Sequence, residues 1–376
     1  MTIAAGSKKV LLICQLDRYA NGLKPVALEQ FLHARGHQVR LVDTYYLSRA
    51  SSSRDSFARK LPSLRPLKLC LYAIELLSLA LTRKWKLGRR WLSYYFLVAE
   101  YRLRGRILAA SLTPDDFDLV ICETPYDAGV LLRTHTARTL YDCPAPWADE
   151  VYFDGRLTKR QHARLRSRER QLFEAVDHLA FHWESYAHYA LEHYGISGHN
   201  LFTLSFGCTP SAERVTYATP LRIVYLGNLS ATFNDTPLLG RLSAKYPHID
   251  VYGGPPPDPE LRLNYLGYSP SVEVLREYQL GLVTCSKDAL RRDGFSSKHL
   301  HYFTYGLPVL VPEWRRYLEL LKGSIPYTEE TFTAAIAALE NETAWQAASD
   351  EAYEQARRLD WAETLRPLEE LLADVG

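Results

Sequence analysis

The sequence has 376 residues, 47% of them apolar and 23% charged, which is enough for two globular domains with separate cores. A net charge of +2 gives no whole-chain indication of nucleic-acid binding, and no apolar run reaches the roughly eighteen uncharged residues of a membrane span. The six scattered cysteines form no CxxC pair and the N-terminus lacks a signal peptide, so we predict a reducing, cytoplasmic location.

Residues 1–207 alternate short apolar runs with amphipathic segments. The run "KVLLIC" is typical of a buried parallel strand, and the helical segment after it ends at Gly36, before the next strand, "VRLVD". Such a βαβ unit predicts a doubly wound parallel sheet, which four later strands extend. These strands are predicted within 117–125, 137–144, 178–185 and 200–207.

Residues 208–220 are polar and rich in turn formers, and we interpret them as a linker between two domains. The α/β pattern then restarts over residues 221–350, beginning with the strand and loop "LRIVYLGNLS". Two successive doubly wound domains predict ligand binding at the carboxyl ends of their strands. Further strands are predicted at 248–257 and 280–286, and helices at 237–247 and 272–279.

The segment "DGFSSKHLHYFTYGLPVLVP" at 293–312 predicts a loop, a short helix, a glycine stop and a strand. Ser296 or Ser297 would cap the helix, which places Lys298 in its first turn. The helix dipole disfavours a lysine there unless an anion lies nearby. Lys298 and the helix-start N–H groups therefore indicate a phosphate site, the alternative being a solvated surface lysine.

The same segment resembles the donor site of GT-B glycosyltransferases of the family 4 type, many of which have "EGFG…E…GxPVV" or "PSKxxEYxxxGxPVV" at this point. The resemblance implies two Rossmann-like domains facing a cleft, and a nucleotide sugar as co-substrate with no other cofactor. It places Asp293 at the first acid of the family's glutamate pair and Lys298 at its phosphate-binding lysine. His301 replaces the second glutamate, which holds the ribose. In this respect the chain looks closer to the inverting glucuronosyltransferases of bacterial exopolysaccharide assembly.

By the same resemblance, Gly227 and Asn228 would lie against the diphosphate, because a residue without a side chain lets the backbone approach closely. The alternative for Gly227 and Asn228 is a plain β-turn. Tyr268 would border the nucleotide base. Residues 351–376 resemble the family's terminal helices, which return to the first domain. The remaining predicted donor-binding residues are Ser286, Gly294, Phe295, Ser296, Ser297 and His301.

An inverting transferase needs a general base for the acceptor hydroxyl, and carboxylates at strand ends of the first domain are the natural source. The loop-like segment "YDCPAPWADE" offers Asp142 and Asp149, and by resemblance Asp149 is the first candidate. Asp17, in the first loop, is a further catalytic candidate. Gly22 and Glu123 are the predicted acceptor-binding residues, and Glu123 is also a base candidate. For each carboxylate, an ordinary loop residue is the alternative.

The segment 54–106 carries thirteen basic residues against three acidic ones, interspersed with apolar runs and aromatic side chains. We interpret residues 60–106 as an insertion in the first domain. The composition of 65–106 indicates an interfacial helix on an anionic membrane surface, the alternative being a buried helical pair with a solvated basic edge. No recognition motif accompanies the basic residues, which argues against nucleic acid.

Together these features predict a hexosyl- or glycuronosyltransferase that moves a sugar from a UDP-sugar to an acceptor hydroxyl. The expected acceptor is a saccharide, lipid-linked or membrane-proximal, as in polysaccharide or glycoconjugate biosynthesis, with the protein peripheral on the inner face of the membrane. No metal is expected, because the DxD formed by Asp116 and Asp118 precedes a strand instead of following one. Two alternatives stay open: a UDP-sugar 2-epimerase on the same architecture, and a non-catalytic relative that scaffolds a membrane assembly.

Overall fold

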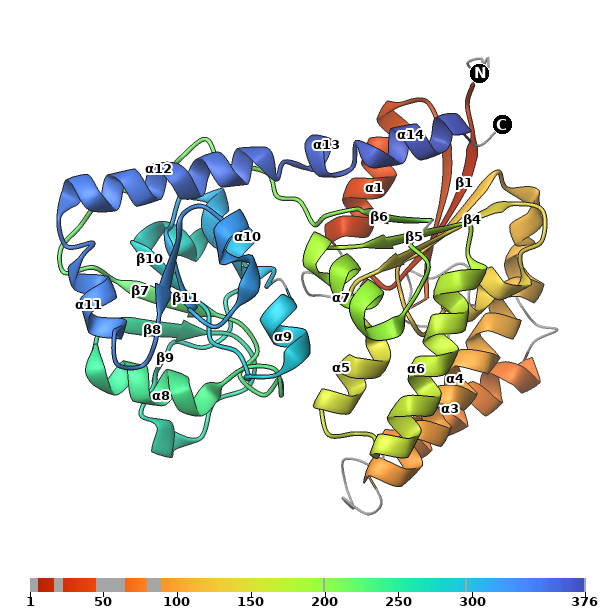
Figure 1. Cartoon of the computed structure of the whole chain (residues 1–376), viewed down its shortest axis with the longest axis horizontal. Helices are drawn as coiled ribbons and strands as arrows, with labels where there is room; N and C mark the ends of the chain where they lie inside the picture. Colours follow the sequence, from red (N-terminus) through yellow and green to blue (C-terminus); the bar gives the residue numbers. More distant parts are fainter. Residues whose placement is uncertain are drawn as a thin grey trace. The chain divides into compact units, whose positions relative to one another are not determined.

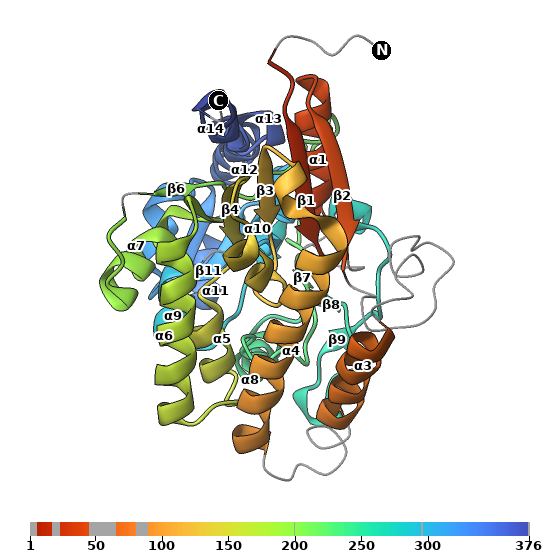
Figure 2. The same ribbon diagram turned by 90° about the vertical axis from the view of Figure 1, so that its right-hand side faces the viewer.

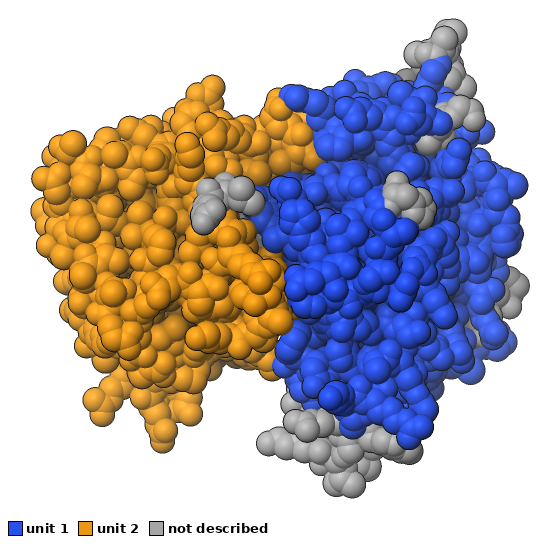
Figure 3. Space-filling view, in the orientation of Figure 1, with its two compact units in different colours: residues 1–205, 365–376 blue, residues 206–364 orange. Residues whose placement is uncertain are grey.

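The computed structural model describes residues 6–16, 23–44, 65–79, 89–198, 200–294 and 296–374. The chain forms two compact units: unit 1 comprises Met1–Ser205 with Leu365–Gly376, and unit 2 comprises Phe206–Thr364 (Figure 3). Each unit contains one six-stranded sheet in which all neighbouring strands are parallel (Figure 1). Two parallel sheets with connecting helices confirm the predicted α/β fold class.

The sheet of unit 1 has the order β2-β1-β3-β4-β5-β6, so the direction of strand addition reverses between β1 and β3. Five of the six residues of β1 are buried, because a parallel sheet is covered by helices on both faces. Side chains that follow the strands gather at the carboxyl edge of the sheet. The strands are β1 (Lys9–Cys14), β2 (Gln38–Asp43), β3 (Leu119–Cys122), β4 (Arg138–Cys143), β5 (His178–Phe181) and β6 (Leu201–Thr203).

Thr158 begins the long helix α6 of unit 1 with a capping box. Its hydroxyl accepts a hydrogen bond from Gln161 N, and the Gln161 side chain accepts one from Thr158 N. Among the described residues, no helix combines the length and the apolar character that crossing a membrane requires. The helices of unit 1 are α1 (Leu23–Ala34), α3 (Arg65–Leu79), α4 (Arg89–Leu112), η4 (Pro114–Asp116), η5 (Ala128–Arg133), α5 (Trp147–Phe153), α6 (Lys159–Ala175), α7 (Glu184–Tyr194) and α14 (Pro367–Asp374).

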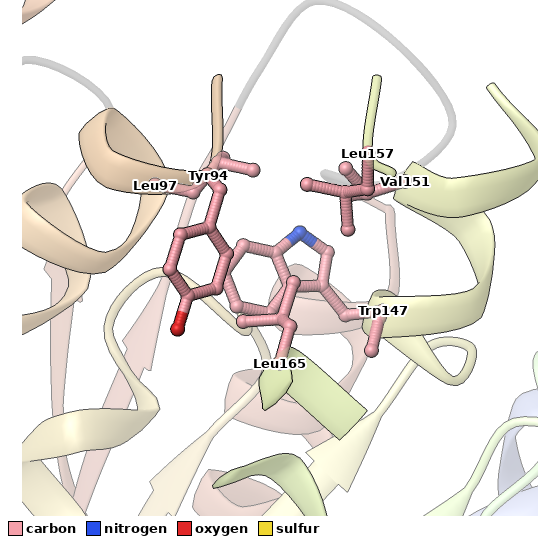
Figure 4. Close-up of a cluster of buried hydrophobic side chains, with 7 residues drawn as sticks. Tyr94, Leu97, Trp147, Val151, Leu157 and Leu165 are labelled. Atoms are coloured by element: carbon pink, nitrogen blue, oxygen red, sulfur yellow. The ribbon is translucent and has the colours of Figure 1, made fainter. Parts of the chain in front are cut away.

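Trp147 joins three helices of unit 1 in one apolar cluster (Figure 4). The buried cluster contains Tyr94 and Leu97 from α4, Val151 from α5 and Leu165 from α6. Removing a buried aromatic side chain of this size costs about 3–5 kcal/mol of stability. The indole ring therefore fixes the short helix α5 against α4 and α6.

The sheet of unit 2 has the order β12-β11-β10-β7-β8-β9, and its direction of strand addition reverses between β7 and β10. That is the strand order of a Rossmann sheet, whose ligands bind at the carboxyl ends of the strands on either side of the reversal. The strands are β7 (Ile223–Leu226), β8 (Ile249–Tyr252), β9 (Asn264–Tyr265), β10 (Leu280–Leu282), β11 (Val309–Pro312) and β12 (Ser324–Tyr327). The helices are α8 (Thr236–Lys245), η6 (Pro259–Leu261), η7 (Val272–Glu277), α9 (Ala289–Asp293), α10 (Lys298–Thr304), η8 (Arg316–Leu320), α11 (Phe332–Ala337), α12 (Glu342–Arg358) and α13 (Trp361–Thr364).

The helix predicted at 272–279 is shorter and tighter than expected, because η7 is a 3-10 helix. Two β-branched residues, Val272 and Val274, disfavour an α-helix there. The side chain of Ser271 accepts a hydrogen bond from Glu273 N and so closes the tight turn.

The chain returns to unit 1 at Leu365, later than the predicted 351, because α12 is bonded into unit 2. Trp345 Nε1 donates a hydrogen bond to Gln279 O at 3.0 Å. Ser349 Oγ, one turn later, donates to Gly306 O at 2.7 Å. Of residues 351–376, only 365–376, which include α14, belong to unit 1.

Candidate functional site

Three glycines follow β7 and β8 where these strands end, and each is required by a close contact. A Cβ on Gly227 would lie 2.5 Å from Cε of Lys298, and a Cβ on Gly253 would lie 2.9 Å from the Gly227 carbonyl oxygen. Gly254, with a φ of +68°, would place a Cβ 2.7 Å from Oδ1 of Asn228. A Cβ at any of the three would collide with a neighbour, and at Gly227 that neighbour is the Lys298 side chain, which packs directly on the glycine.

Lys298 is the first residue of α10, and its half-buried side chain lies against Gly227. Its Nζ donates to Oδ1 of Asn234 at 3.2 Å and lies 5.3 Å and 5.7 Å from the ring centroids of Tyr225 and Phe233. Among the described residues, no carboxylate lies within ion-pair distance of this Nζ. A partly desolvated cation with one neutral acceptor is suited to receive an anion.

The charge states at the site follow from burial. Burial lowers the pKa of Lys298 to about 8, and nearby arginines lower it further while Cys285 raises it. Burial, and then Lys298, lower the pKa of His301 to about 4. At neutral pH the site therefore presents a charged lysine beside a neutral imidazole. An anion bound at Nζ would favour the charged form of the lysine.

Tyr302 fixes α10 to the sheet at the point where the strand order reverses. Its hydroxyl accepts a hydrogen bond from Leu226 N at 3.0 Å and donates one to Leu282 O at 3.2 Å, which links β7 to β10. A Cβ on Gly281 would lie 2.4 Å from the Tyr302 ring, so the ring packs directly on the β10 backbone. Lys298 is thereby held at the carboxyl ends of β7 and β10, where ligands bind in such sheets.

Arg315, which sequence reasoning missed, holds the loop before α10. The residue is 5% exposed, and its guanidinium donates to Gly294 O and, at 3.3 Å, to Cys285 Sγ. These partners precede it in sequence by 21 and 30 positions, so no local pattern could have revealed the contact. Asp293 is also buried and forms ion pairs with arginines 292 and 316 at 3.2 Å and 3.5 Å, which stabilise the same loop.

The start of α10 differs from the prediction. Ser297 occupies the N-cap position with helical φ and ψ, and its side chain makes no capping hydrogen bond. The N–H groups of His299 and Leu300 donate to the carbonyl oxygens of Ser296 and Ser297 at 3.0 Å and 3.1 Å. Because these amide hydrogens are already bonded in the turn, they are not available as predicted, and an anion site here depends on the Lys298 side chain.

Three further predicted donor residues lie in the loops of unit 2. Asn228 is exposed, and its Oδ1 accepts from Ser230 N at 3.0 Å and from Ser230 Oγ at 2.8 Å. The Ser286 hydroxyl donates to Asp288 at 2.9 Å, and Asp288 in turn caps α9. Tyr268 is 60% exposed. The side chains of Asn228 and Ser286 thus shape loops, and contact of any of the three with a donor stays a prediction.

A buried charged cluster lies at the carboxyl edge of the unit 1 sheet. Asp142, at the end of β4, is fully buried and forms an ion pair with Lys24 Nζ at 2.6 Å. His182 Nε2 lies 3.2 Å from the same carboxylate, and Lys24 also donates to Leu204 O. Lys24 and His182, neither of which the sequence singled out, therefore occupy both oxygens of Asp142.

Glu123, which follows β3, completes this cluster. Burial raises the pKa of Glu123 well above its usual range, and the Asp142 carboxylate raises it further. Burial also acts to raise the pKa of Asp142, but Lys24 and His182 outweigh it, so that pKa is lowered. The pKa of Glu123 is thus raised while that of Asp142 is lowered. Such a difference allows one carboxyl group to exchange a proton while the other stays charged.

Asp149 lies within helix α5 and not in the loop that the sequence predicted. Pro146 is the N-cap residue and supplies no side-chain hydrogen bond. The cap comes instead from Glu169 on α6, whose carboxylate accepts from Trp147 N at 2.7 Å and from Ala148 N at 2.9 Å. A cap supplied by another helix leaves no local sequence signal, and this is why the helix was missed.

The Asp149 carboxylate is occupied on both oxygens. The residue is 1% exposed; Oδ1 contacts His162 Nε2, and Oδ2 accepts from the Tyr189 hydroxyl at 2.7 Å. Arg166 Nη2 lies 3.4 Å from Oδ2. These contacts join α5, α6 and α7, so the geometry gives Asp149 a structural role and lends no support to its predicted role as base.

Three predicted site residues, Asp17, Gly22 and Phe295, lie outside the described residues. Within the described ranges, no three His, Cys, Asp or Glu side chains are grouped so that they could hold a metal ion. Metal independence stays a prediction of the sequence.

Solved structures with known activities share this architecture. Sucrose-phosphate synthase from Thermosynechococcus elongatus matches 98% of this chain and 99% of its own, with a TM-score of 0.66 at 12% identity. The lipopolysaccharide outer core galactosyltransferase WaaB in its apo form matches 97% of this chain and 99% of its own, with a TM-score of 0.57 at 11% identity. Both similarities extend over nearly the whole chain.

A third structure, the pneumococcal O-GlcNAc transferase GtfA in complex with UDP and GlcNAc, matches 73% of this chain, with a TM-score of 0.53 at 17% identity. This chain spans 59% of the length of that GtfA chain. No protein-family model matches the sequence, and no curated protein matches it significantly. At these identities the structural matches establish the fold, which is the predicted GT-B fold of glycosyltransferases.

Proposed function

We propose that this chain, which has the GT-B fold of glycosyltransferases, transfers a sugar from a nucleotide diphosphate donor to an acceptor hydroxyl. The observation that carries the proposal is Lys298 in unit 2. It is a half-buried lysine without a carboxylate partner among the described residues, held at the carboxyl ends of β7 and β10 beside the backbone of Gly227. A diphosphate is an anion that such a lysine binds, and the Gly227 N–H, which donates to Tyr252 O, is not counted as a donor to it.

A UDP-sugar is the donor we favour, and GtfA, a structural neighbour, is described in complex with UDP. His301 would take the ribose hydroxyls as a neutral imidazole, since its pKa is lowered to about 4. Tyr268, largely exposed, would lie against the base. The acceptor would be a saccharide or glycoconjugate, in line with the activity in the name of WaaB.

Transfer with inversion requires a base in unit 1, and Glu123 is the residue we assign to it. Its raised pKa makes its ionised form a stronger base than an ordinary carboxylate, while Lys24 holds the neighbouring Asp142 charged. Glu123 would accept the proton of the acceptor hydroxyl as its oxygen bonds to the anomeric carbon. The bond from that carbon to the diphosphate breaks, and UDP leaves with the bonding electrons.

Lys298 would stabilise the leaving group. Negative charge grows on the diphosphate as its bond to the sugar breaks. A fixed cation beside the diphosphate therefore stabilises the transition state more than the ground state. Tyr302 holds the helix that carries Lys298 on β7 and β10, so little reorganisation accompanies the reaction.

Calorimetry with UDP and a UDP-release assay with candidate acceptors test the proposal. Lys298→Ala should raise the Kd for UDP at least about tenfold, since a charge-assisted hydrogen bond contributes about 1.5–3 kcal/mol. The control is Lys245→Ala, whose lysine is paired with Glu329 on the surface of the same unit. Glu123→Gln should lower kcat at least about a hundredfold and leave UDP binding intact.

Release of UDP only when an acceptor is present identifies a transferase. Conversion of the UDP-sugar without an acceptor would identify a 2-epimerase instead. Binding of UDP with no turnover of any donor would identify a non-catalytic relative.

A further inference from the structure

Helix α3 of unit 1 presents an apolar face to solvent. Leu69, Leu76 and Leu77 are 67%, 47% and 53% exposed, although leucine is among the residues most often buried. Pro66, Cys70 and Ala73 on the same helix are exposed as well. We call these six residues the α3 stripe. Scattered exposed leucines are ordinary, but a contiguous exposed face of this kind marks an interaction surface.

The α3 stripe follows the helical repeat. At 100° per residue its six members fall within an arc of about 120°, which is the width of the buried face of an ordinary amphipathic helix. Leu71 lies outside that arc and is fully buried, and α3 packs against α4 (Figures 1 and 2). The helix therefore has a buried contact on one side and a second, exposed apolar face on another.

The sequence around the α3 stripe is strongly basic. Residues 54–106 carry thirteen lysines and arginines and only three acidic residues. Within the described part, Arg102 and Arg106 of α4 are exposed. In the sequence, this apolar helix face thus stands among basic residues, a combination typical of segments that lie on an anionic bilayer, where apolar side chains enter the acyl boundary and basic ones meet lipid headgroups.

We propose that the α3 stripe docks on an anionic lipid bilayer, with α3 lying in the plane of the membrane surface. A second copy of this chain is a poorer occupant, because pairing two stripes would bring two strongly basic segments together and like charges repel. The inference does not depend on sugar transfer, and binding to lipid can be measured without any donor or acceptor.

Cys70 provides a direct probe, since it lies in the α3 stripe and is exposed while the other five cysteines are buried. An environment-sensitive fluorophore such as acrylodan on Cys70 should shift its emission to the blue when full-length protein meets vesicles of phosphatidylcholine with phosphatidylglycerol. Vesicles of phosphatidylcholine alone should give little shift, and salt should weaken the anionic response. Sedimentation with anionic vesicles without a shift at Cys70 would place the lipid contact elsewhere and overturn the proposal.

Substitution of the stripe leucines tests the same surface. The triple variant Leu69→Glu, Leu76→Glu and Leu77→Glu should lower the fraction sedimented with anionic vesicles at least about tenfold. Leu132→Glu is the matched control, because Leu132 is 45% exposed on η5 of the same unit and should bind as wild type. A serine triple variant serves if the glutamate one fails to fold.

Two results would overturn the proposal outright. One is equal sedimentation of the wild type and the triple variant with anionic vesicles. The other is a concentration-dependent dimer, seen by light scattering, that the triple variant abolishes, because the stripe would then be an interface between two copies.

Discussion

Replacement of Gly227 by alanine tests the geometry around Lys298 most finely. The added methyl would lie 2.5 Å from Cε and 3.2 Å from Nζ of Lys298. Unbonded carbon atoms prefer about 3.5–4.0 Å, so the lysine stem must move by about 1 Å. The stem is flexible, so we expect only about 1–2 kcal/mol of lost stability, part of it from the left-handed φ of +156°.

The affinity for UDP should suffer more than the stability does. A displacement of about 1 Å at a positioned group can cost up to about a hundredfold, and we expect the Kd for UDP to rise at least about tenfold. Calorimetry measures the Kd, and urea denaturation measures the stability. Gly155→Ala is the control. Gly155 also has a positive φ, +70°, but no atom lies within 4 Å of a Cβ built there, so this variant introduces backbone strain without a steric clash. If Gly227→Ala binds UDP as tightly as the wild type, Nζ is not the group that holds the diphosphate.

Three other predictions follow from the titratable groups. The affinity for UDP should be nearly constant below pH 8 and fall by up to about tenfold per pH unit above it, because the pKa of Lys298 is lowered to about 8 and the neutral amine cannot hold an anion; calorimetry of Lys298→Ala should show no such fall. Lys24→Met should destabilise unit 1 by about 3–5 kcal/mol, since it removes the lysine cation from the buried Asp142 carboxylate and leaves only His182 of the two partners described above, and Asp142→Leu in the same chain should restore much of the loss in urea denaturation. Asp149→Asn should lower the melting temperature and leave the kcat of the folded enzyme near that of the wild type, and a large loss of kcat would return Asp149 to the role of base.

The strands of both units can be predicted from the sequence because a buried parallel strand is a continuous apolar run. "KVLLIC" coincides with β1, and the apolar part of "LRIVYLGNLS" coincides with β7 up to the glycine that ends it. Gly227, at the end of such a run, was singled out through the family resemblance, and its close contact with Lys298 comes from a residue 71 positions later in the chain.

Polar partners distant in sequence could not be predicted in this way. Lys24 lies in an amphipathic helix, and its partner Asp142 follows 118 positions later, so periodicity assigns the lysine to the surface. Arg104 and Asp127 form a similar buried pair at 2.6 Å. Such pairs depend on which elements the fold brings together. The sequence pattern of each element alone does not specify these contacts.

The exposed face of α3 could not be predicted from the sequence either. Composition alone left two interpretations of residues 65–106, a buried helical pair or a helix on a membrane. The structure shows that α3 packs against α4 and still exposes three leucines, and the contact with a membrane stays a proposal. The packing partners of an apolar helix determine which of its faces is buried. The residue pattern within the helix does not identify that face.

The structure of the full-length protein crystallised with UDP is the most direct test of the central claim, that Lys298 binds the diphosphate of a nucleotide donor. We expect both phosphates beside the carboxyl ends of β7 and β10, with a phosphate oxygen within about 3 Å of Lys298 Nζ and close to the Gly227 backbone. UDP bound in any other part of the molecule, with Nζ still on Asn234, would contradict the claim.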